Sequence, residues 1–168
     1  MRQDLSFYIV ETEVGFVGLV ISDQGLRHTT LPRTTRDRAL TDVAELGATR
    51  AAPETDVRGI SNDVQTLGAG RHADLSRYVD WHGVTPFQRA VLEQTMRIPL
   101  GETRSYGEIA ELAGSPRAAR AVGRVMATNP LPFIVPCHRV IGSDGTLHGY
   151  GGGLDLKERL LKVEGVRV

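Results

Sequence analysis

Helix start and stop signals between residues 85 and 130 constrain the fold of this chain more than any other feature. Thr85 is followed by Pro and, three positions on, by Gln, which is a capping box with Pro at the first helical position. It predicts a helix that ends at about Arg97. A second capping box begins at Ser105 and predicts a short helix through Ala113. This part of the chain is therefore expected to be mostly helical.

A third helix is predicted from Pro116 to about Thr128, because Gly114 ends the helix before it. Two short helices joined by a turn that contains glycine have the layout of a helix-turn-helix. The second of these helices carries cations at spacings of three and four, which places them on one face: Arg117, Arg120 and Arg124. Such a face contacts phosphates in DNA-binding helices, but it is also typical of an ordinary solvated helix. Both interpretations stay open at this point.

The N-terminal half has strand patterns instead. Residues 39–46 predict a short helix, 47–59 a loop, and 60–80 give only weak helical signals. Three β-rich segments with turn residues between them predict an antiparallel meander: 5–10, 14–21 and 26–31. The predicted fold is an α/β N-terminal scaffold domain over 1–80 with a small antiparallel sheet. A mostly helical, winged-helix-like domain over 81–168 follows and contains the helix-turn-helix.

Composition and charge exclude several classes of protein. The 168 residues are 40% apolar and 24% charged, and no apolar run reaches the roughly 18 residues of a membrane span. One cysteine cannot form an intramolecular disulfide, and the first residues lack a secretory signal, so we expect a location in the cytoplasm or nucleoid. The net charge of zero hides nine basic and twelve acidic residues over 1–80, and eleven basic and eight acidic residues over 81–168. His28, His72 and His82 lack metal-ligand spacing, and no metal is expected.

The only cysteine, Cys137, stands between an apolar run and two groups that can lower a thiol pKa, His138 and Arg139. The run over 133–135 predicts a buried strand that ends at Pro136. Successive side chains of a strand point to opposite faces, so adjacency alone does not bring the imidazole to the sulfur. The stretch by itself leaves Cys137 equally open to two interpretations, a small buried structural residue and a nucleophile.

Two features follow Cys137. The glycine-rich loop over 148–153 lacks the residue order of a phosphate-binding loop, and its glycines suggest backbone amides close to a ligand, with Tyr150 as one wall. A final helix is predicted with Asp155 as its N-terminal cap and Leu160, Leu161 and Val163 directed inward. Glu164 at its end stands where the helix dipole disfavours a carboxylate, which indicates either a tertiary partner or full solvation.

An ordered set of short motifs runs through residues 85–165. They are TPFQ at 85–88, IPLGET at 98–103, SY at 105–106, AARAVG at 118–123, NP at 129–130, PCHRV at 136–140 and GY with its glycines at 149–153. Together they resemble the O6-alkylguanine-DNA alkyltransferase family, whose members repair DNA by moving an alkyl group irreversibly onto their own cysteine. The resemblance covers about half of the chain, and the strands over 5–31 resemble the family's N-terminal strands more loosely.

The resemblance implies a direct-reversal repair enzyme, a methylated-DNA–protein-cysteine methyltransferase that acts once per molecule. The implied partner is double-stranded DNA that carries O6-alkylguanine, and O4-alkylthymine is an implied second substrate. Cys137 would be the alkyl acceptor. His138 would act on it through a water molecule, with Glu164 polarising the imidazole, and Asn129 would tie the recognition helix to the active-site strand. No cofactor is implied.

The resemblance also implies how the lesion is presented. Arg120 would enter the duplex in place of the flipped guanine, and Tyr106 would rotate the target phosphate and donate toward the base. Further implied DNA-contacting residues are Arg117, Ala118, Ala119, Gly123 and Arg124. The residues implied to line the substrate pocket are Met126, Pro132, Val140, Tyr150 and Gly151.

The chain departs from the family pattern at several points. Leu92 replaces a tryptophan of many relatives, and Gly151 replaces a serine of some, which leaves the width of the pocket open. The second, phosphotriester-accepting cysteine of larger relatives is absent. Two other interpretations stay open: a binding protein that flags lesions without repairing them, against which Cys137 argues, and a Cys-His-Glu thiol hydrolase. We expect a monomer without membrane contact, and clustering on DNA stays open.

Overall fold

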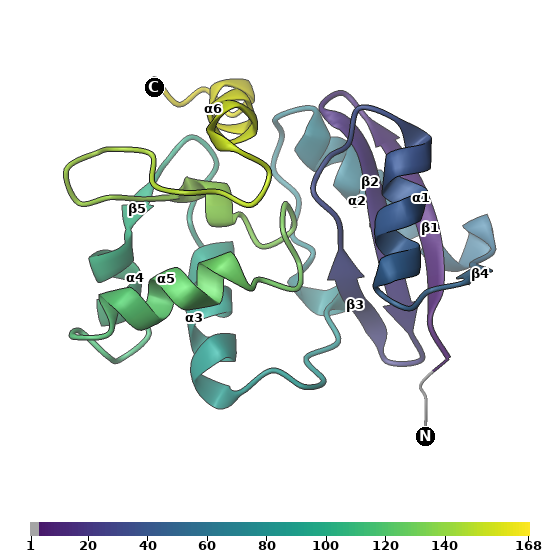
Figure 1. The fold of residues 1–168 in the computed structure, drawn as a ribbon, viewed down its shortest axis with the longest axis horizontal. Coiled ribbons are helices and arrows are strands. Elements are labelled where there is room, and N and C mark those ends of the chain that lie inside the picture. The colour runs from purple at the N-terminus through teal and green to yellow at the C-terminus, as the bar shows by residue number, and fades with distance from the viewer. Residues whose placement is uncertain (1–3) are drawn as a thin grey trace. The chain divides into compact units, whose positions relative to one another are not determined.

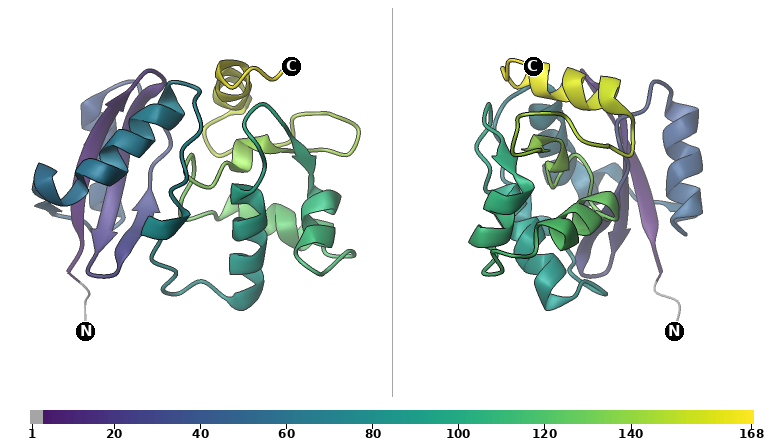
Figure 2. Two further views of the ribbon diagram at one scale, coloured as in Figure 1. Left: turned by 180° about the vertical axis from the view of Figure 1, so that it is seen from behind. Right: turned by 60° about the vertical axis from the view of Figure 1, so that its left-hand side comes forward.

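The computed structural model describes residues 4–168, which form two units (Figures 1 and 2). The first unit comprises the residues up to His82 together with Pro130–Ile134, and the second comprises Gly83–Asn129 together with Val135–Val168. The sequence does not anticipate that the short segment 130–134 groups with the N-terminal residues. The roles of 1–80 as scaffold and 81–168 as acceptor domain stay predictions. No helix within residues 4–168 is long and apolar enough to cross a membrane.

The first unit contains the predicted meander of β1 (Ser6–Thr12), β2 (Gly15–Ser22) and β3 (Gly25–Thr29), paired antiparallel. A fourth strand, β4 (Arg50–Ala51), pairs parallel with β1, so that the strand order is β3-β2-β1-β4. The sheet is therefore mixed, and the prediction of an antiparallel sheet was wrong in this respect. The chain reaches β4 only after a helix, and a helical crossover allows parallel pairing.

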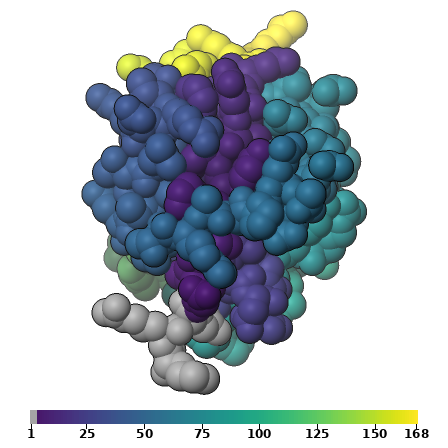
Figure 3. All heavy atoms as spheres, turned by 90° about the vertical axis from the view of Figure 1, so that its right-hand side faces the viewer, coloured from purple at the N-terminus to yellow at the C-terminus, as the bar shows by residue number. Residues whose placement is uncertain are grey.

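Two helices cover opposite faces of this sheet, α1 (Arg36–Glu45) and α2 (Glu54–Gly68) (Figures 1 and 2). In Figure 3, α1 (blue) lies beside β1 (purple). The core under α1 contains Ile9 and Val20 of the sheet and Val43 of the helix, all nearly inaccessible to solvent. The predicted loop over 47–59 was wrong, because it contains β4 and the beginning of α2. A 3₁₀ helix, η1 (Ser76–Tyr78), follows α2.

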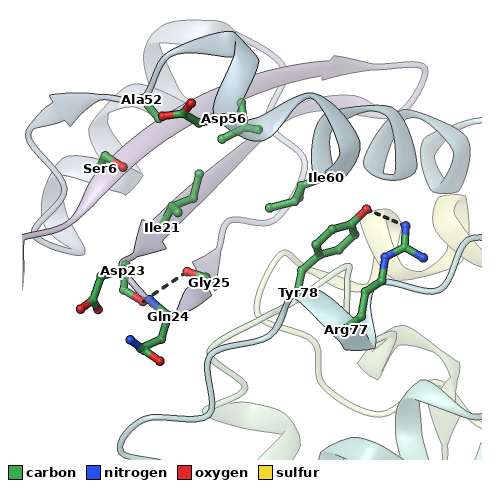
Figure 4. A pocket seen from close by; sticks show the side chains of 12 residues that line it. Ser6, Ile21, Asp23, Gln24, Gly25, Ala52, Asp56, Ile60, Arg77 and Tyr78 are labelled. Atoms are coloured by element: carbon green, nitrogen blue, oxygen red, sulfur yellow. Dashed lines mark hydrogen bonds between the residues drawn. The ribbon is translucent and has the colours of Figure 1, made fainter.

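An open pocket of about 480 Å³ lies on the first unit, lined from the β2–β3 turn, α2 and η1 (Figure 4). Its aliphatic wall includes Ile21 and Ile60, and Arg77 donates to the Tyr78 hydroxyl at 2.6 Å on its other side. None of its lining residues is a cysteine or a histidine.

The segment that precedes Cys137 accepts hydrogen bonds from the backbone and the side chain of Thr29 in β3. The amide of Thr29 donates to the carbonyl of Pro130 at 3.1 Å, and its hydroxyl donates to the carbonyl of Pro132 at 2.6 Å. Phe133 is buried and has a φ of 74°, in the left-handed region that non-glycine residues rarely adopt. The predicted strand over 133–135 was wrong. Prolines at 130, 132 and 136 remove the N–H groups that a strand ladder needs.

The second unit contains the predicted helices. Both capping boxes are formed: Thr85 and Gln88 bond each other's backbone N–H groups, and so do Ser105 and Glu108. The two short strands are parallel and pair Arg104 with Val140. The elements in chain order are α3 (Pro86–Met96), β5 (Arg104–Ser105), α4 (Tyr106–Leu112), α5 (Ala119–Ala127), β6 (Val140–Ile141) and α6 (Leu154–Val163).

Helix α5 begins at Ala119 and not at Pro116. The amide of Ala118 donates to the carbonyl of Ser115 at 2.9 Å, so Pro116 occupies the second position of a turn, where its fixed φ fits as well as at a helix start. The connection between α4 and α5 is therefore longer than predicted. Leu112 of α4 is apolar but 56% exposed.

Helix α6 also differs in detail from the prediction. Asp155 lies inside its first turn, and the N-cap is Gly153, which has no side chain to cap the helix. Leu160 and Leu161 are buried as predicted, whereas Val163 is 41% exposed. Glu164 is the C-cap.

Candidate active site around Cys137

Cys137 lies in a short 3₁₀ helix, η2 (Cys137–Arg139), and not at the end of a strand. Its amide donates to the carbonyl of Val135 at 2.7 Å, and its side chain is buried. A 3₁₀ helix has about three residues per turn, so consecutive side chains point in three different directions. The side chains of His138 and Arg139 therefore point away from the sulfur and contact another part of the second unit.

The group they reach is the carboxylate of Glu164. Nε2 of His138 lies 2.8 Å from Oε1, and Arg139 donates from Nε to Oε2 at 2.8 Å and from Nη2 to Oε1 at 2.9 Å. The third nitrogen of Arg139 donates to the carbonyl of Ile98 at 2.7 Å. Burial alone raises the pKa of Glu164, but the hydrogen bonds from His138 and Arg139 outweigh it and lower the pKa to about 2. Glu164 is ionised at neutral pH and has a tertiary partner at its helix end.

His138 is 1% exposed, and burial lowers the pKa of its imidazole while the hydrogen bond to Glu164 acts in the opposite direction. A neutral imidazole carries one proton, and a carboxylate can only accept, so Nε2 carries the proton and donates to Glu164. Nδ1 is then the basic nitrogen. It is buried and makes no hydrogen bond to any described residue.

The thiol of Cys137 has a raised pKa because burial disfavours the thiolate. A hydrogen bond from the Asn129 side chain and the positive charge of Lys157 partly offset this effect. Asn129 also donates from Nδ2 to the carbonyl of Val135 at 3.2 Å. Asn129, just after α5, thus links the end of that helix to the residues directly before the thiol.

Sequence reasoning missed two residues of this cluster. Lys157 is 1% exposed and donates from Nζ to the carbonyls of Val140 at 2.8 Å and His148 at 3.4 Å. Burial lowers the pKa of Lys157, and the negative charge of a Cys137 thiolate counteracts this shift. The sequence does contain a signal that Lys157 is buried, because Lys157 precedes Leu160 by three positions and so lies on the inward face of α6. Arg139 was noted as a cation beside the thiol, but its two bonds to Glu164 were not foreseen.

The residues implied to line the substrate pocket lie in different surroundings. Val140 is buried, Met126 and Tyr150 are half-buried, and Gly151 is exposed. Burial, and to a smaller degree the charge of Cys137, raise the pKa of Tyr150 well above its ordinary value. Pro132 belongs to the segment grouped with the first unit. The pocket roles of all five residues stay predictions.

Tyr106 is the first residue of α4, directly after the capping Ser105. Burial raises the pKa of its hydroxyl, and the charge of Cys137 raises it further. Tyr106 thus lies within electrostatic reach of the thiol, although 31 positions separate them in the chain.

The arginines predicted to share a helix face are only partly on one helix. Arg120 and Arg124 lie in α5 and are exposed, whereas Arg117 is exposed in the turn before it. Arg117 lies outside the helix because α5 begins only at Ala119. The small residues of this surface leave the helix backbone accessible, and a side chain at Gly123 would meet no atom within 4 Å. The other two small residues of this surface are Ala118, which is the N-cap of α5, and Ala119, which is its first helical residue.

No group of three or more His, Cys, Asp or Glu side chains within residues 4–168 could hold a metal ion. The chemistry available around Cys137 is that of a buried thiol, a neutral imidazole held by an ionised carboxylate, a buried ammonium and two tyrosine hydroxyls.

Residues 86–166 match the family model of the 6-O-methylguanine DNA methyltransferase DNA-binding domain. The chain is 46% identical over 136 residues to a methylated-DNA–protein-cysteine methyltransferase of Mycolicibacterium paratuberculosis, with 77% of this chain and 82% of the relative covered. It is 38% identical over 159 residues to a protein of the same name from Methanosarcina acetivorans, with 95% and 97% covered.

Solved structures are similar over nearly the whole chain. The crystal structure of Mycobacterium tuberculosis O6-methylguanine methyltransferase superposes with a TM-score of 0.76 at 35% identity, covering 95% of this chain and 92% of the other. The M. tuberculosis OGT in complex with DNA superposes with a TM-score of 0.74 at 34% identity, covering 95% and 93%. Because the identity exceeds one third over nearly complete chains, the protein belongs to the methylated-DNA–protein-cysteine methyltransferase family.

Proposed function

We propose that this protein repairs DNA by direct reversal, moving the alkyl group of O6-alkylguanine to the sulfur of Cys137 once per molecule. The observation that carries the proposal is the cluster at the thiol: a buried cysteine beside a neutral His138 whose Nε2 is held by an ionised Glu164. O4-alkylthymine belongs to the same proposal as a second substrate. The relatives named above carry this activity in their names.

The thiol must lose its proton before it attacks, because the thiolate is the nucleophile. We assign the base to Nδ1 of His138, which takes the proton through a bridging water molecule. Glu164 stabilises the imidazolium that forms, as a carboxylate does for the histidine of other nucleophile–base pairs. Asn129 and Lys157 stabilise the thiolate, through a hydrogen bond and a positive charge respectively.

The transfer is then a displacement at a saturated carbon. The sulfur of Cys137 forms a bond to the alkyl carbon while the bond from that carbon to O6 breaks, and the electron pair stays with guanine. The departing guanine takes up one proton from solvent, which restores ordinary guanine, and the Tyr106 hydroxyl stabilises the negative charge that develops on it by donating a hydrogen bond. The thioether product has no leaving route, so each molecule reacts once.

The lesion must leave the base stack to reach a buried sulfur, which costs on the order of a few kcal/mol. We propose that α4 and α5 form a winged-helix-like helix-turn-helix with α5 against the DNA groove. Arg120 fills the gap left by the flipped guanine, and Tyr106 rotates the target phosphate. Arg117 and Arg124 contact phosphates, and the small residues at 118, 119 and 123 allow close approach of the backbone.

We further propose the organisation in which this chemistry operates. Residues 1–80 act as scaffold, and residues 81–168 bind DNA and accept the alkyl group. Met126, Pro132, Val140, Tyr150 and Gly151 line the pocket for the flipped base. The protein works as a monomer on nucleoid DNA in the cytoplasm.

Intact-mass measurement after incubation with a duplex that contains O6-methylguanine tests the function. We expect an increment of one methylene, limited to one per molecule and mapped to the Cys137 peptide, and none for Cys137→Ser. Binding without a mass change would identify a lesion-flagging protein. Repeated turnover of a small thioester or amide would identify a thiol hydrolase. A parallel duplex with O4-methylthymine tests the second substrate in the same way.

A further inference from the structure

The ring of His148 contacts the ring of Tyr106, which lies within electrostatic reach of Cys137. The two ring centroids are 6.0 Å apart, and the ring planes make an angle of 75°, which is the edge-to-face arrangement that aromatic pairs prefer. His148 comes from the loop between β6 and α6 and is exposed, so the contact joins this loop to the first residue of α4.

The hydrogen bonds of the same loop determine how the His148 ring is oriented. Thr146 donates its single hydroxyl proton to Oδ1 of Asp144 at 2.7 Å. The hydroxyl oxygen lies 3.1 Å from Nε2 of His148 and can only accept there, so Nε2 carries the proton and donates. This chain of two bonds, from Asp144 through Thr146 to His148, selects one tautomer and one direction for the ring.

Two further features restrict the position of His148. The carbonyl of His148 accepts a hydrogen bond from the buried Nζ of Lys157 at 3.4 Å. Gly142 is buried directly beside the imidazole, and a Cβ at that position would overlap the ring. The ring is thus confined by a hydrogen-bond acceptor, by the backbone at Gly142 and by the ring of Tyr106.

We propose that His148 is a positioning residue for the transfer reaction, which sets the direction of the Tyr106 hydroxyl by holding the Tyr106 ring in an edge-to-face contact. The proposal rests on the function proposed above, in which that hydroxyl acts on the flipped nucleotide. His148 itself touches neither the substrate nor the sulfur. Without the His148 ring, Tyr106 keeps its hydroxyl, but the direction of that hydroxyl can vary. Transfer is then slower although no reacting group has been removed.

A double-mutant cycle tests the proposal, with the single-turnover rate constant for transfer from an O6-methylguanine duplex to Cys137 as the readout. We expect His148→Ala to lower the rate about fivefold, the size of one aromatic contact. In a Tyr106→Phe background, where the ring contact persists and the hydroxyl is gone, the same substitution should leave the rate unchanged. An equal fold-loss in both backgrounds would overturn the proposal, because His148 would then act independently of the hydroxyl.

Conservative substitutions separate positioning from folding. His148→Phe retains an aromatic edge and should keep most of the rate, and a loss as large as that of His148→Ala would contradict the proposed contact. Thr146→Val removes the acceptor that orients the imidazole and should slow transfer about twofold, as expected for one lost neutral hydrogen bond, whereas Thr146→Ser should not. The two proposals fail differently: a wild-type protein that does not methylate Cys137 refutes the function, and a methylating protein with an additive cycle refutes only the role of His148.

Discussion

At Glu164, a single buried carboxylate accepts hydrogen bonds from His138 and from two nitrogens of Arg139. The hydrogen bonds from His138 and Arg139 together keep the carboxylate ionised at physiological pH, and the ionised carboxylate fixes the His138 tautomer with Nδ1 as the base. The sequence left Glu164 open to a tertiary partner or to full solvation, and it could not identify Arg139 as a partner, because that contact spans 25 positions and depends on the 3₁₀ turn.

Replacing Glu164 tests this arrangement through the pH dependence of transfer. In Glu164→Gln the negative charge that favours the protonated imidazole is lost, so the pKa of His138 falls further and its Nδ1 becomes a weaker base. The thiol is then harder to ionise, its apparent pKa rises, and the rate–pH profile should move to higher pH. At neutral pH we expect a loss of about a hundredfold, typical of a disabled general base.

The matched control is Glu158→Gln on the same helix. Glu158 forms an exposed ion pair with Lys162, four positions on, and an exposed pair contributes little. Its rate–pH profile should match that of the wild type. An unchanged profile in Glu164→Gln would contradict the proton relay.

Among the elements, those set by local chemistry were predicted well. The capping boxes at Thr85 and Ser105 formed because each is complete within four residues. Pro116 misled the prediction of α5, since proline fits both the first turn of a helix and the second position of a β-turn, and the sequence cannot choose between them. The apolar run at 133–135 misled it in another way: its residues are buried as predicted, but as an irregular segment and not as a strand.

The backbone of Phe133 gives a stability prediction. A left-handed φ costs a residue with a Cβ about 1 to 2 kcal/mol relative to glycine. Phe133→Ala and Phe133→Gly both lose the buried ring, but only the second relieves this strain. We expect Phe133→Ala to have the lower free energy of unfolding by about 1 kcal/mol, measured by urea denaturation. Ile134, buried with an ordinary φ, should show the reverse order for the same pair of substitutions.

Helix α5 gives a prediction about base flipping. Arg120→Ala should slow transfer from duplex DNA by about 10- to 100-fold, since the gap in the stack is no longer filled, yet react normally with a free O6-alkylguanine base. Arg124→Ala, one turn further along α5, is the control. It should weaken DNA affinity and reduce its salt dependence by about one ion, with little effect on transfer once bound. Equal losses of Arg120→Ala on both substrates would contradict its assigned role.

At the scale of the whole molecule, the chain passes between its two units three times, because the segment 130–134 returns to the first unit. This segment lies between Asn129 and Val135, the two residues joined by the hydrogen bond next to Cys137. No sequence signal predicts that residues 130–134 return to the first unit. Their contacts there include Thr29 of β3, whose amide and hydroxyl donate to carbonyls about a hundred positions away.

Thr29 therefore has a measurable role in stability. Thr29→Val keeps the shape of the side chain and the β propensity but leaves the carbonyl of Pro132 without this donor. We expect a loss of about 1 kcal/mol in the free energy of unfolding. Thr29→Ser keeps the hydroxyl and should retain most of this stability. A Thr29→Val protein as stable as the wild type would show that the carbonyl finds another donor.

The return of residues 130–134 also sets an order of events during synthesis. An N-terminal domain ordinarily completes its fold as soon as it leaves the ribosome. Here the first unit lacks Leu131, Phe133 and Ile134, all buried, until most of the chain has been translated. Contacts between residues so distant in sequence also form slowly. The first unit therefore cannot be complete until the segment immediately before the reactive cysteine has been translated.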